Sequence, residues 1–176
     1  MGYAGGTTSA PTYHNLGDHT ETLQVDFDPS RVGYAELLEV FWKEHSPTSR
    51  TWSRQYRPVV FYHDEQQRSL AHATKDRVAA VLGSAVFTEI LPATRFTMAE
   101  DYHQKYSLRQ ARDLLQEFKA IYPAEADLVA STAAARMNGY LAGHGSREQL
   151  QGEIDRLGLS PTGRTRLLEM AARRAR

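Results

Sequence analysis

The stretch that decides the fold reads GDHTETLQVDFDP and covers residues 17–29. After Glu21, every second residue is apolar (Leu23, Val25 and Phe27), while the residues between them are polar. This is the two-residue period of a strand with one buried face. Asp28 and Pro29 follow, and both residue types favour the end of a strand. The sequence therefore predicts a half-buried strand over residues 21–27, entered at Glu21.

Glu21 stands on the apolar face of this strand, at its first position. A carboxyl group there loses hydration, which favours its neutral form, and a neutral acid can donate a hydrogen bond or a proton. The alternative is a frayed first residue whose carboxylate turns into water. The strand alone favours this alternative, because charged side chains are seldom buried without a role or a partner.

The composition describes an ordinary globular chain of 176 residues, with 21 basic and 21 acidic side chains. The charge balance gives no reason to expect a nucleic-acid partner. Without a membrane-length apolar run or a signal-peptide pattern, the sequence predicts a soluble, cytoplasmic protein with no membrane partner. The chain has no cysteine. It therefore contains no disulfide, no thiolate metal site and no cysteine nucleophile.

Local signals place the other elements. Residues 1–13 are a glycine-rich loop, in which Gly5-Gly6 predicts a sharp turn or a close backbone approach. A helix is expected from Tyr34 to about Glu44, and strands are expected over residues 57–62 and 86–91. Asp64 predicts the start of a long helix that stops at Gly83. From residue 107 onward, amphipathic segments broken at residues 122–123 and 143–145 predict a small helical appendage.

Few chemical sites fit the remaining polar residues. Seven histidines are scattered without metal-ligand spacing, so no metal is expected. Neither a nucleophile elbow nor a phosphate-binding loop is present. What remains is Glu21, with Tyr13 and Tyr56 as hydroxyl donors in loops. Such a trio suits a neutral oxygen that accepts strong hydrogen bonds, although sequence spacing leaves open whether the three side chains meet.

Six motifs, in the same order over residues 1–106, resemble the A-type peptide methionine sulfoxide reductases. They are Gly2-Tyr3-Ala4-Gly5-Gly6, Pro11-Thr12-Tyr13, His19-Thr20-Glu21, Phe27-Asp28-Pro29, Gln55-Tyr56-Arg57 and Ala99-Glu100-Asp101-Tyr102-His103-Gln104. The loop Trp52-Ser53-Arg54-Gln55-Tyr56 and the helical tail resemble one branch of this family.

The resemblance implies an α/β (α+β) fold with a ferredoxin-like split βαβ core and reduction of methionine-S-sulfoxide, free or in proteins. Glu21 would correspond to the acid that protonates the sulfoxide oxygen, with Tyr13 and Tyr56 as the tyrosines that hold it. His19, Trp52 and Gln55 would contact substrate. No cofactor is implied, and the partners would be proteins containing methionine sulfoxide and thioredoxin or another thiol reductant.

Three departures from the family pattern stand out. The Gly-Cys-Phe-Trp-Gly motif, which lies upstream of the glycine loop, is not in the chain, so the nucleophile and the first strand and helix of the core are missing. Thr51 replaces a family aspartate, and no resolving cysteine follows. The chain as written should be inactive. Met1 stands where relatives carry a small apolar residue, which suggests a mis-called gene start or a fragment.

The expected organisation is a truncated reductase core over residues 1–106 and a helical extension over residues 107–176. Two other functions stay open at this point. A catalytically silent chain could still bind methionine sulfoxide through its glutamate and tyrosines. Alternatively, the helical tail could be an interaction module attached to an inactive core.

Overall fold

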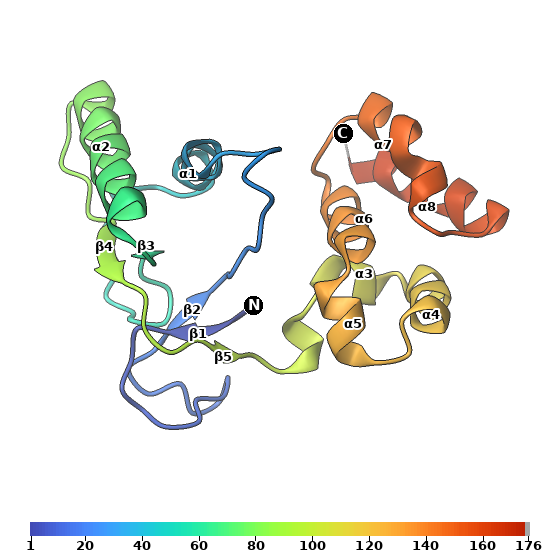
Figure 1. Cartoon of the computed structure of the whole chain (residues 1–176), viewed down its shortest axis with the longest axis horizontal. Helices are drawn as coiled ribbons and strands as arrows, with labels where there is room; N and C mark the ends of the chain where they lie inside the picture. The colour runs from blue at the N-terminus through green and yellow to red at the C-terminus, as the bar shows by residue number, and fades with distance from the viewer. Residues whose placement is uncertain (175–176) are drawn as a thin grey trace. The chain divides into compact units, whose positions relative to one another are not determined.

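The computed structural model describes residues 1–174 and shows two compact units, Met1–Glu100 (unit 1) and Asp101–Arg176 (unit 2), drawn in Figure 1. Unit 1 combines helices with small sheets, whereas the regular structure described in unit 2 is helical. The mixed α/β class predicted from the sequence is therefore confirmed. The division into a reductase core and an extension at residue 106 stays a prediction.

Unit 1 contains two small sheets. Strands β1 (Gly2–Ala4), β2 (Thr20–Thr22) and β5 (Thr97–Met98) form an antiparallel sheet with β1 in the middle (Figure 1). Tyr3 in β1 stands opposite Glu21 in β2 on one side and opposite Thr97 in β5 on the other. Strands β3 (Val59–Tyr62) and β4 (Glu89–Pro92) form a separate parallel pair. Glu21 therefore lies on β2, and its neighbour β1 is paired with a strand on each side.

The strand predicted over residues 21–27 is wrong in its extent. β2 covers only Thr20–Thr22, and Leu23 and Val25 are 65% and 50% exposed. The reason is the register, since Gly2 pairs with Thr22 and leaves residues from Leu23 onward beyond the described ladder. Alternating side chains form a strand only where an opposite backbone pairs with them.

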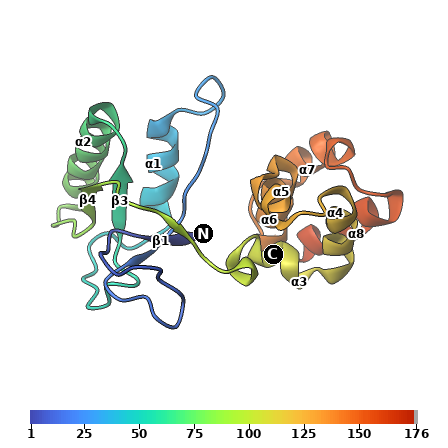
Figure 2. The same ribbon diagram turned by 60° about the horizontal axis from the view of Figure 1, so that its bottom comes forward.

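Two helices pack together in unit 1. α1 (Tyr34–Lys43) and α2 (Glu65–Leu82) lie side by side in both views (Figures 1 and 2). Their contact buries a small apolar core, which includes Leu38 and Trp42 of α1, Val60 of β3 and Ala71 of α2.

The ends of α2 agree with the sequence prediction. The side chain of Asp64 accepts a hydrogen bond of 2.7 Å from the backbone N–H of Gln67 at the helix start. Gly83 ends the helix in a left-handed conformation, φ 58°, which glycine adopts without strain. Both boundaries are set by local contacts, and both are confirmed.

Unit 2 is a bundle of short helices. They are α3 (Tyr106–Gln110), α4 (Arg112–Ile121), α5 (Glu125–Ala130), α6 (Thr132–Ala142), α7 (Arg147–Glu153) and α8 (Pro161–Arg174), with 3-10 turns at Asp101–His103 and Ile154–Arg156. The breaks predicted near Pro123 and Gly143 are confirmed, and after the second break Ser146 forms a capping box with Gln149 at the start of α7. The stretch between these two breaks forms two helices, α5 and α6, because the Ser131 side chain accepts a hydrogen bond from the Ala134 N–H and so caps the start of α6.

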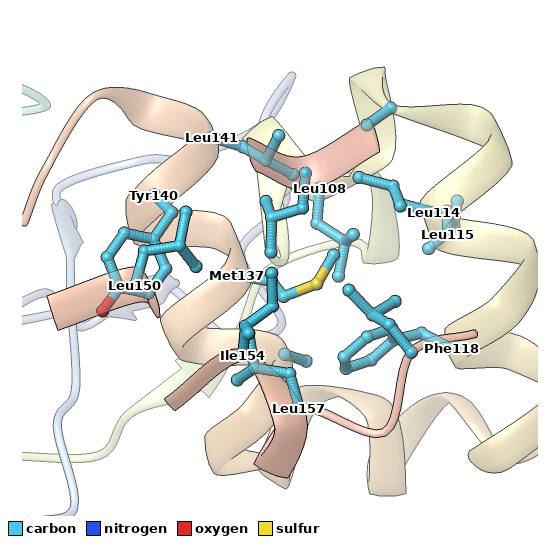
Figure 3. Packing of buried hydrophobic residues seen from close by; sticks show 14 of the residues in the cluster. Leu108, Leu114, Leu115, Phe118, Met137, Tyr140, Leu141, Leu150, Ile154 and Leu157 are labelled. Atoms are coloured by element: carbon cyan, nitrogen blue, oxygen red, sulfur yellow. The ribbon is translucent and has the colours of Figure 1, made fainter. Parts of the chain in front are cut away.

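One apolar core holds unit 2 together. Leu108, Phe118 and Met137 are fully buried, and they come from α3, α4 and α6 (Figure 3). Leu150 of α7 and Ile154 of the 3-10 turn that follows it belong to the same cluster. No helix of the described residues 1–174 has the length and apolar character needed to cross a bilayer.

Candidate active site

Strand β2 is attached to the loop that carries Gln55 and Tyr56. The hydroxyl of Thr20, a residue only 1% exposed, donates to the Arg54 carbonyl at 3.0 Å and accepts from Arg57 Nε at 2.8 Å. One residue further, the backbone N–H of Glu21 donates to the Gln55 carbonyl at 3.0 Å. Three hydrogen bonds, two at Thr20 and one at Glu21, thus hold the strand and the loop together.

The side chains at this junction form a polar cluster, which we call the Glu21 cluster: Tyr13, Glu21, Gln55 and Tyr56. Gln55 Nε2 donates to Glu21 Oε1 at 2.6 Å. The side chains of Tyr13, Glu21 and Gln55 all lie close enough to the Tyr56 hydroxyl to influence its pKa. The structure therefore brings the acid and both tyrosines together, a point that sequence spacing left open.

The surroundings of Tyr56 change the acidity of its hydroxyl. Partial desolvation, followed by the charges of Tyr13 and Glu21 and the hydrogen bond to Tyr13, raises the pKa of Tyr56 above its usual 10.0. The side chain remains 60% exposed, so the hydroxyl group is held in place while the residue stays open to solvent. A phenol that resists ionisation remains a hydrogen-bond donor at neutral and mildly alkaline pH.

Tyr13 occupies the tip of a tight turn. Thr12 and Asn15 close this turn with reciprocal backbone hydrogen bonds of 3.3 and 3.1 Å. From outside the turn, Glu100 Oε1 accepts from the backbone N–H of Tyr13 at 3.0 Å. The Tyr13 side chain stays 38% exposed. The turn thus presents a tyrosine at the surface while its backbone is fixed.

The glycine-rich loop before this turn is held by Asp18. Its carboxylate accepts from the backbone N–H groups and the hydroxyls of Thr7 and Thr8, at 2.8–3.0 Å. The Thr8 and Thr7 backbone donors hold the pKa of this carboxyl well below its usual range, so the group stays ionised. Gly5 has φ 75°, and a Cβ there would meet the Phe61 ring at 2.6 Å. The sequence predicted a sharp turn or a close approach at Gly5-Gly6, and the structure shows a left-handed backbone and a close neighbour at Gly5.

The three residues predicted to contact substrate, His19, Trp52 and Gln55, lie in different surroundings. Gln55 belongs to the Glu21 cluster. His19 is buried, and its Nε2 lies 2.9 Å from the Thr8 carbonyl oxygen, so it supports the glycine-rich loop. Trp52 is 96% exposed and lines a groove of about 340 Å³ together with Arg50, Phe87 and other residues. The roles of all six candidate residues in substrate binding or catalysis stay predictions.

Sequence reasoning missed the residues that support the cluster. Asp18, Thr20 and Glu100 make the contacts described above, although no pattern in the sequence assigns them a role of their own. A signal for Asp18 was available, because a loop with two glycines and two threonines has backbone donors that need an acceptor. Glu100 stands within one of the six family motifs, but its partner Tyr13 is 87 positions away.

The described residues also bear on metal chemistry. Among residues 1–174, no group of three or more histidine, aspartate or glutamate side chains could hold a metal ion. The Glu21 cluster contains a carboxyl group, an amide and two phenols, which can form hydrogen bonds with an uncharged polar group. The arrangement can therefore hold and polarise an oxygen atom by hydrogen bonds.

Comparison with known proteins gives a consistent result. The family model described as peptide methionine sulfoxide reductase matches residues 1–134. A peptide methionine sulfoxide reductase of Drosophila melanogaster is 41% identical over 166 residues, which cover 93% of this chain and 66% of that protein. Peptide methionine sulfoxide reductase MsrA of Methanosarcina acetivorans is 41% identical over 132 residues, covering 68% of this chain and 70% of that protein. The chain thus spans about two thirds of the length of these relatives.

Solved structures agree with the sequence comparisons. Mxr1 from Saccharomyces cerevisiae in its reduced form aligns with a TM-score of 0.58 and 28% identity, covering 63% of this chain and 69% of that one. Methionine sulfoxide reductase A of Corynebacterium diphtheriae aligns with a TM-score of 0.52 and 32% identity, covering 63% of this chain and 62% of that one. The chain therefore belongs to the peptide methionine sulfoxide reductase family.

Proposed function

We propose that this chain binds methionine-S-sulfoxide, in proteins or as the free amino acid, and that Glu21, Tyr13 and Tyr56 hold the sulfoxide oxygen. The observation that carries the proposal is the Glu21 cluster itself, in which Gln55 orients the carboxyl group at 2.6 Å and contacts the Tyr56 hydroxyl. Membership of the family supports the choice of substrate. Substrate contacts of His19 and Trp52 belong to the same proposal.

The chemistry suits these groups. A sulfoxide oxygen carries partial negative charge and accepts hydrogen bonds, so two phenols and a protonated carboxyl group can bind it. Proton donation from Glu21 makes the sulfur electrophilic. A thiolate then attacks the sulfur, the oxygen passes to that thiol as a sulfenic acid, and the sulfoxide becomes a thioether. A second thiol condenses with the sulfenic acid, forming a disulfide and releasing water.

The thiols must come from outside these 176 residues, because the sequence contains no cysteine. We propose thioredoxin, or another protein or small-molecule thiol, as the final reductant, and a cytoplasmic location. The residues described above would supply binding and proton donation, while the thiol would supply the electron pair. We expect the pure chain, without added thiol, to bind sulfoxide and leave it unreduced.

An NMR titration tests the binding. The S epimer of N-acetylmethionine sulfoxide is added to the full chain, with the R epimer and N-acetylmethionine as comparison ligands. Amide signals of β2 and of residues 54–57 should shift with the S epimer. Because a hydrogen bond to a charged or strongly polarised group contributes about 1.5–3 kcal/mol, Glu21→Ala should weaken binding by about 10- to 100-fold.

Glu44, an exposed glutamate at the end of α1, offers a matched control. Glu44→Ala should bind like the parent chain. The proposed site is contradicted if no amide signal of β2 shifts, or if Glu21→Ala and Glu44→Ala lose the same affinity for the S epimer. Reduction of the sulfoxide by the pure chain without thiol contradicts the proposed chemistry.

A further inference from the structure

Glu100 makes two contacts that have no part in the chemistry described above. Its Oε1 accepts from the backbone N–H of Tyr13 at 3.0 Å, and its Oε2 accepts from the Tyr3 hydroxyl at 2.7 Å. The two donors lie 87 and 97 positions away in sequence. A carboxylate that accepts from a backbone amide and a phenol at once fixes both groups relative to each other.

Tyr3 connects this carboxylate to the strand of Glu21. The Tyr3 side chain is 1% exposed, so its position is set by packing. Its backbone stands opposite Glu21 in the β1–β2 ladder. A continuous path therefore runs from Glu21 through Tyr3 and the Glu100 carboxylate to the turn that carries Tyr13.

The backbone of Glu100 is fixed as well. It follows β5, where Thr97 pairs with Tyr3 and the backbone N–H of Ala99 donates to the Met1 carbonyl at 3.1 Å. The carboxylate thus starts from the same sheet that carries Glu21. Tyr13, in contrast, sits at the tip of a turn whose own closure at Thr12 and Asn15 does not connect it to the sheet.

We propose that Glu100 is a positioning residue, which holds Tyr13 at the correct place beside Glu21 for both to reach one sulfoxide oxygen. This inference rests on the proposed function of the Glu21 cluster. Glu100 does not touch substrate. It acts through the Tyr13 backbone, and the Tyr3 hydroxyl sets the orientation of its carboxylate.

Three substitutions separate this role from general stabilisation. Glu100→Ala removes both contacts. Glu100→Gln keeps an oxygen that can accept from the Tyr13 N–H and introduces an NH₂ group that can donate to the Tyr3 hydroxyl. This variant should therefore preserve the position of Tyr13. Tyr3→Phe removes the phenol donor that orients the carboxylate and keeps the buried ring.

Two measurements are made on each full-length variant. The first is the affinity for the S epimer of N-acetylmethionine sulfoxide, which Glu100→Ala should weaken about five- to tenfold and Glu100→Gln should leave nearly unchanged. The second is the Tyr56 phenol titration, followed by NMR of ¹³C-labelled tyrosine and assigned with Tyr56→Phe. Release of Tyr13 should lower the pKa of Tyr56 towards its ordinary value, because the Tyr13 hydrogen bond and charge help to raise it.

The outcomes separate the two proposals. If the parent chain binds no sulfoxide, the proposed function fails, and the Tyr56 titration alone still tests Glu100. A folded Glu100→Ala variant with an unchanged Tyr56 titration overturns the inference. A Glu100→Gln variant that loses as much sulfoxide affinity as Glu100→Ala also overturns it. Should Glu100→Ala not fold, Tyr3→Phe decides, since an unchanged Tyr56 titration there also overturns it.

Discussion

Thr20→Val tests whether the junction between β2 and the 54–57 loop holds the Glu21 cluster together. Valine has nearly the same shape as threonine but lacks the hydroxyl, which donates to the Arg54 carbonyl and accepts from Arg57. In a residue that is 1% exposed, water cannot replace these contacts at the threonine itself. The substitution therefore removes two hydrogen bonds and leaves the packing intact.

The expected loss follows from the type of each bond. A neutral hydrogen bond contributes about 1 kcal/mol and one with a charged partner about 1.5–3 kcal/mol, so the two together contribute about 2.5–4 kcal/mol. The Arg57 side chain is 15% exposed and keeps its ion pair with Glu89 at 3.2 Å, so water and Glu89 offset part of its loss. We expect the unfolding free energy of unit 1 to fall by about 2–3 kcal/mol.

Tryptophan fluorescence in a urea titration measures this change in unit 1 alone. The chain has two tryptophans, Trp42 and Trp52, and both lie in unit 1. Trp42 is 7% exposed and Trp52 is 96% exposed, so the signal of unfolding comes mainly from Trp42. The urea midpoint should fall by about 1–2 M.

Thr20→Ser is the matched control, because it keeps the hydroxyl and loses one buried methyl group, at a cost of about 1 kcal/mol. The reasoning is refuted if the valine variant is as stable as the serine variant. In addition, the valine variant should bind the S-sulfoxide more weakly, since the loop that carries Gln55 and Tyr56 would no longer be fixed to β2.

Two further predictions concern the pH response of unit 1 and the core of unit 2. The pKa of Tyr56 is raised in the folded chain, so its contribution to stability is complete below about pH 10 and is lost as the pH rises through the folded pKa. Urea titrations at alkaline pH should therefore show a smaller loss of stability for Tyr56→Phe than for the parent chain. An identical loss of stability in both chains contradicts this. Phe118→Ala removes a fully buried ring and should lower the stability of the helical unit by about 3–5 kcal/mol in thermal circular dichroism, whereas the exposed Ile121→Ala should change it much less.

Local signals in the sequence are sufficient to predict much of the fold. The ends of α2 follow from Asp64 and Gly83, because a helix cap involves residues only a few positions apart. The extent of β2 could not be found in the same way. Alternation continues to Phe27, yet the ladder ends at Thr22, because pairing depends on a strand at the other end of the glycine-rich loop.

Prediction from local sequence signals has the same limit for single residues of the candidate site. Tyr13, Glu21 and Tyr56 could be named because their chemistry suits an oxygen ligand and because they match a family motif. Their supports could not be named, since the motifs that contain Thr20 and Glu100 do not show which distant residues these two side chains contact. Only the fold reveals that such residues accept or donate across 34 to 97 positions.

These supports also bear on what the site requires in order to form. Glu21 is held by Gln55, the 54–57 loop is held by Thr20, and Tyr13 is held by Glu100. Every one of these contacts lies within unit 1 and involves no thiol. The groups that would bind and protonate the sulfoxide oxygen are therefore organised independently of the sulfur nucleophile. Sulfoxide affinity and the availability of a thiol should consequently vary separately, so a binding measurement on this chain can assess the oxygen site alone.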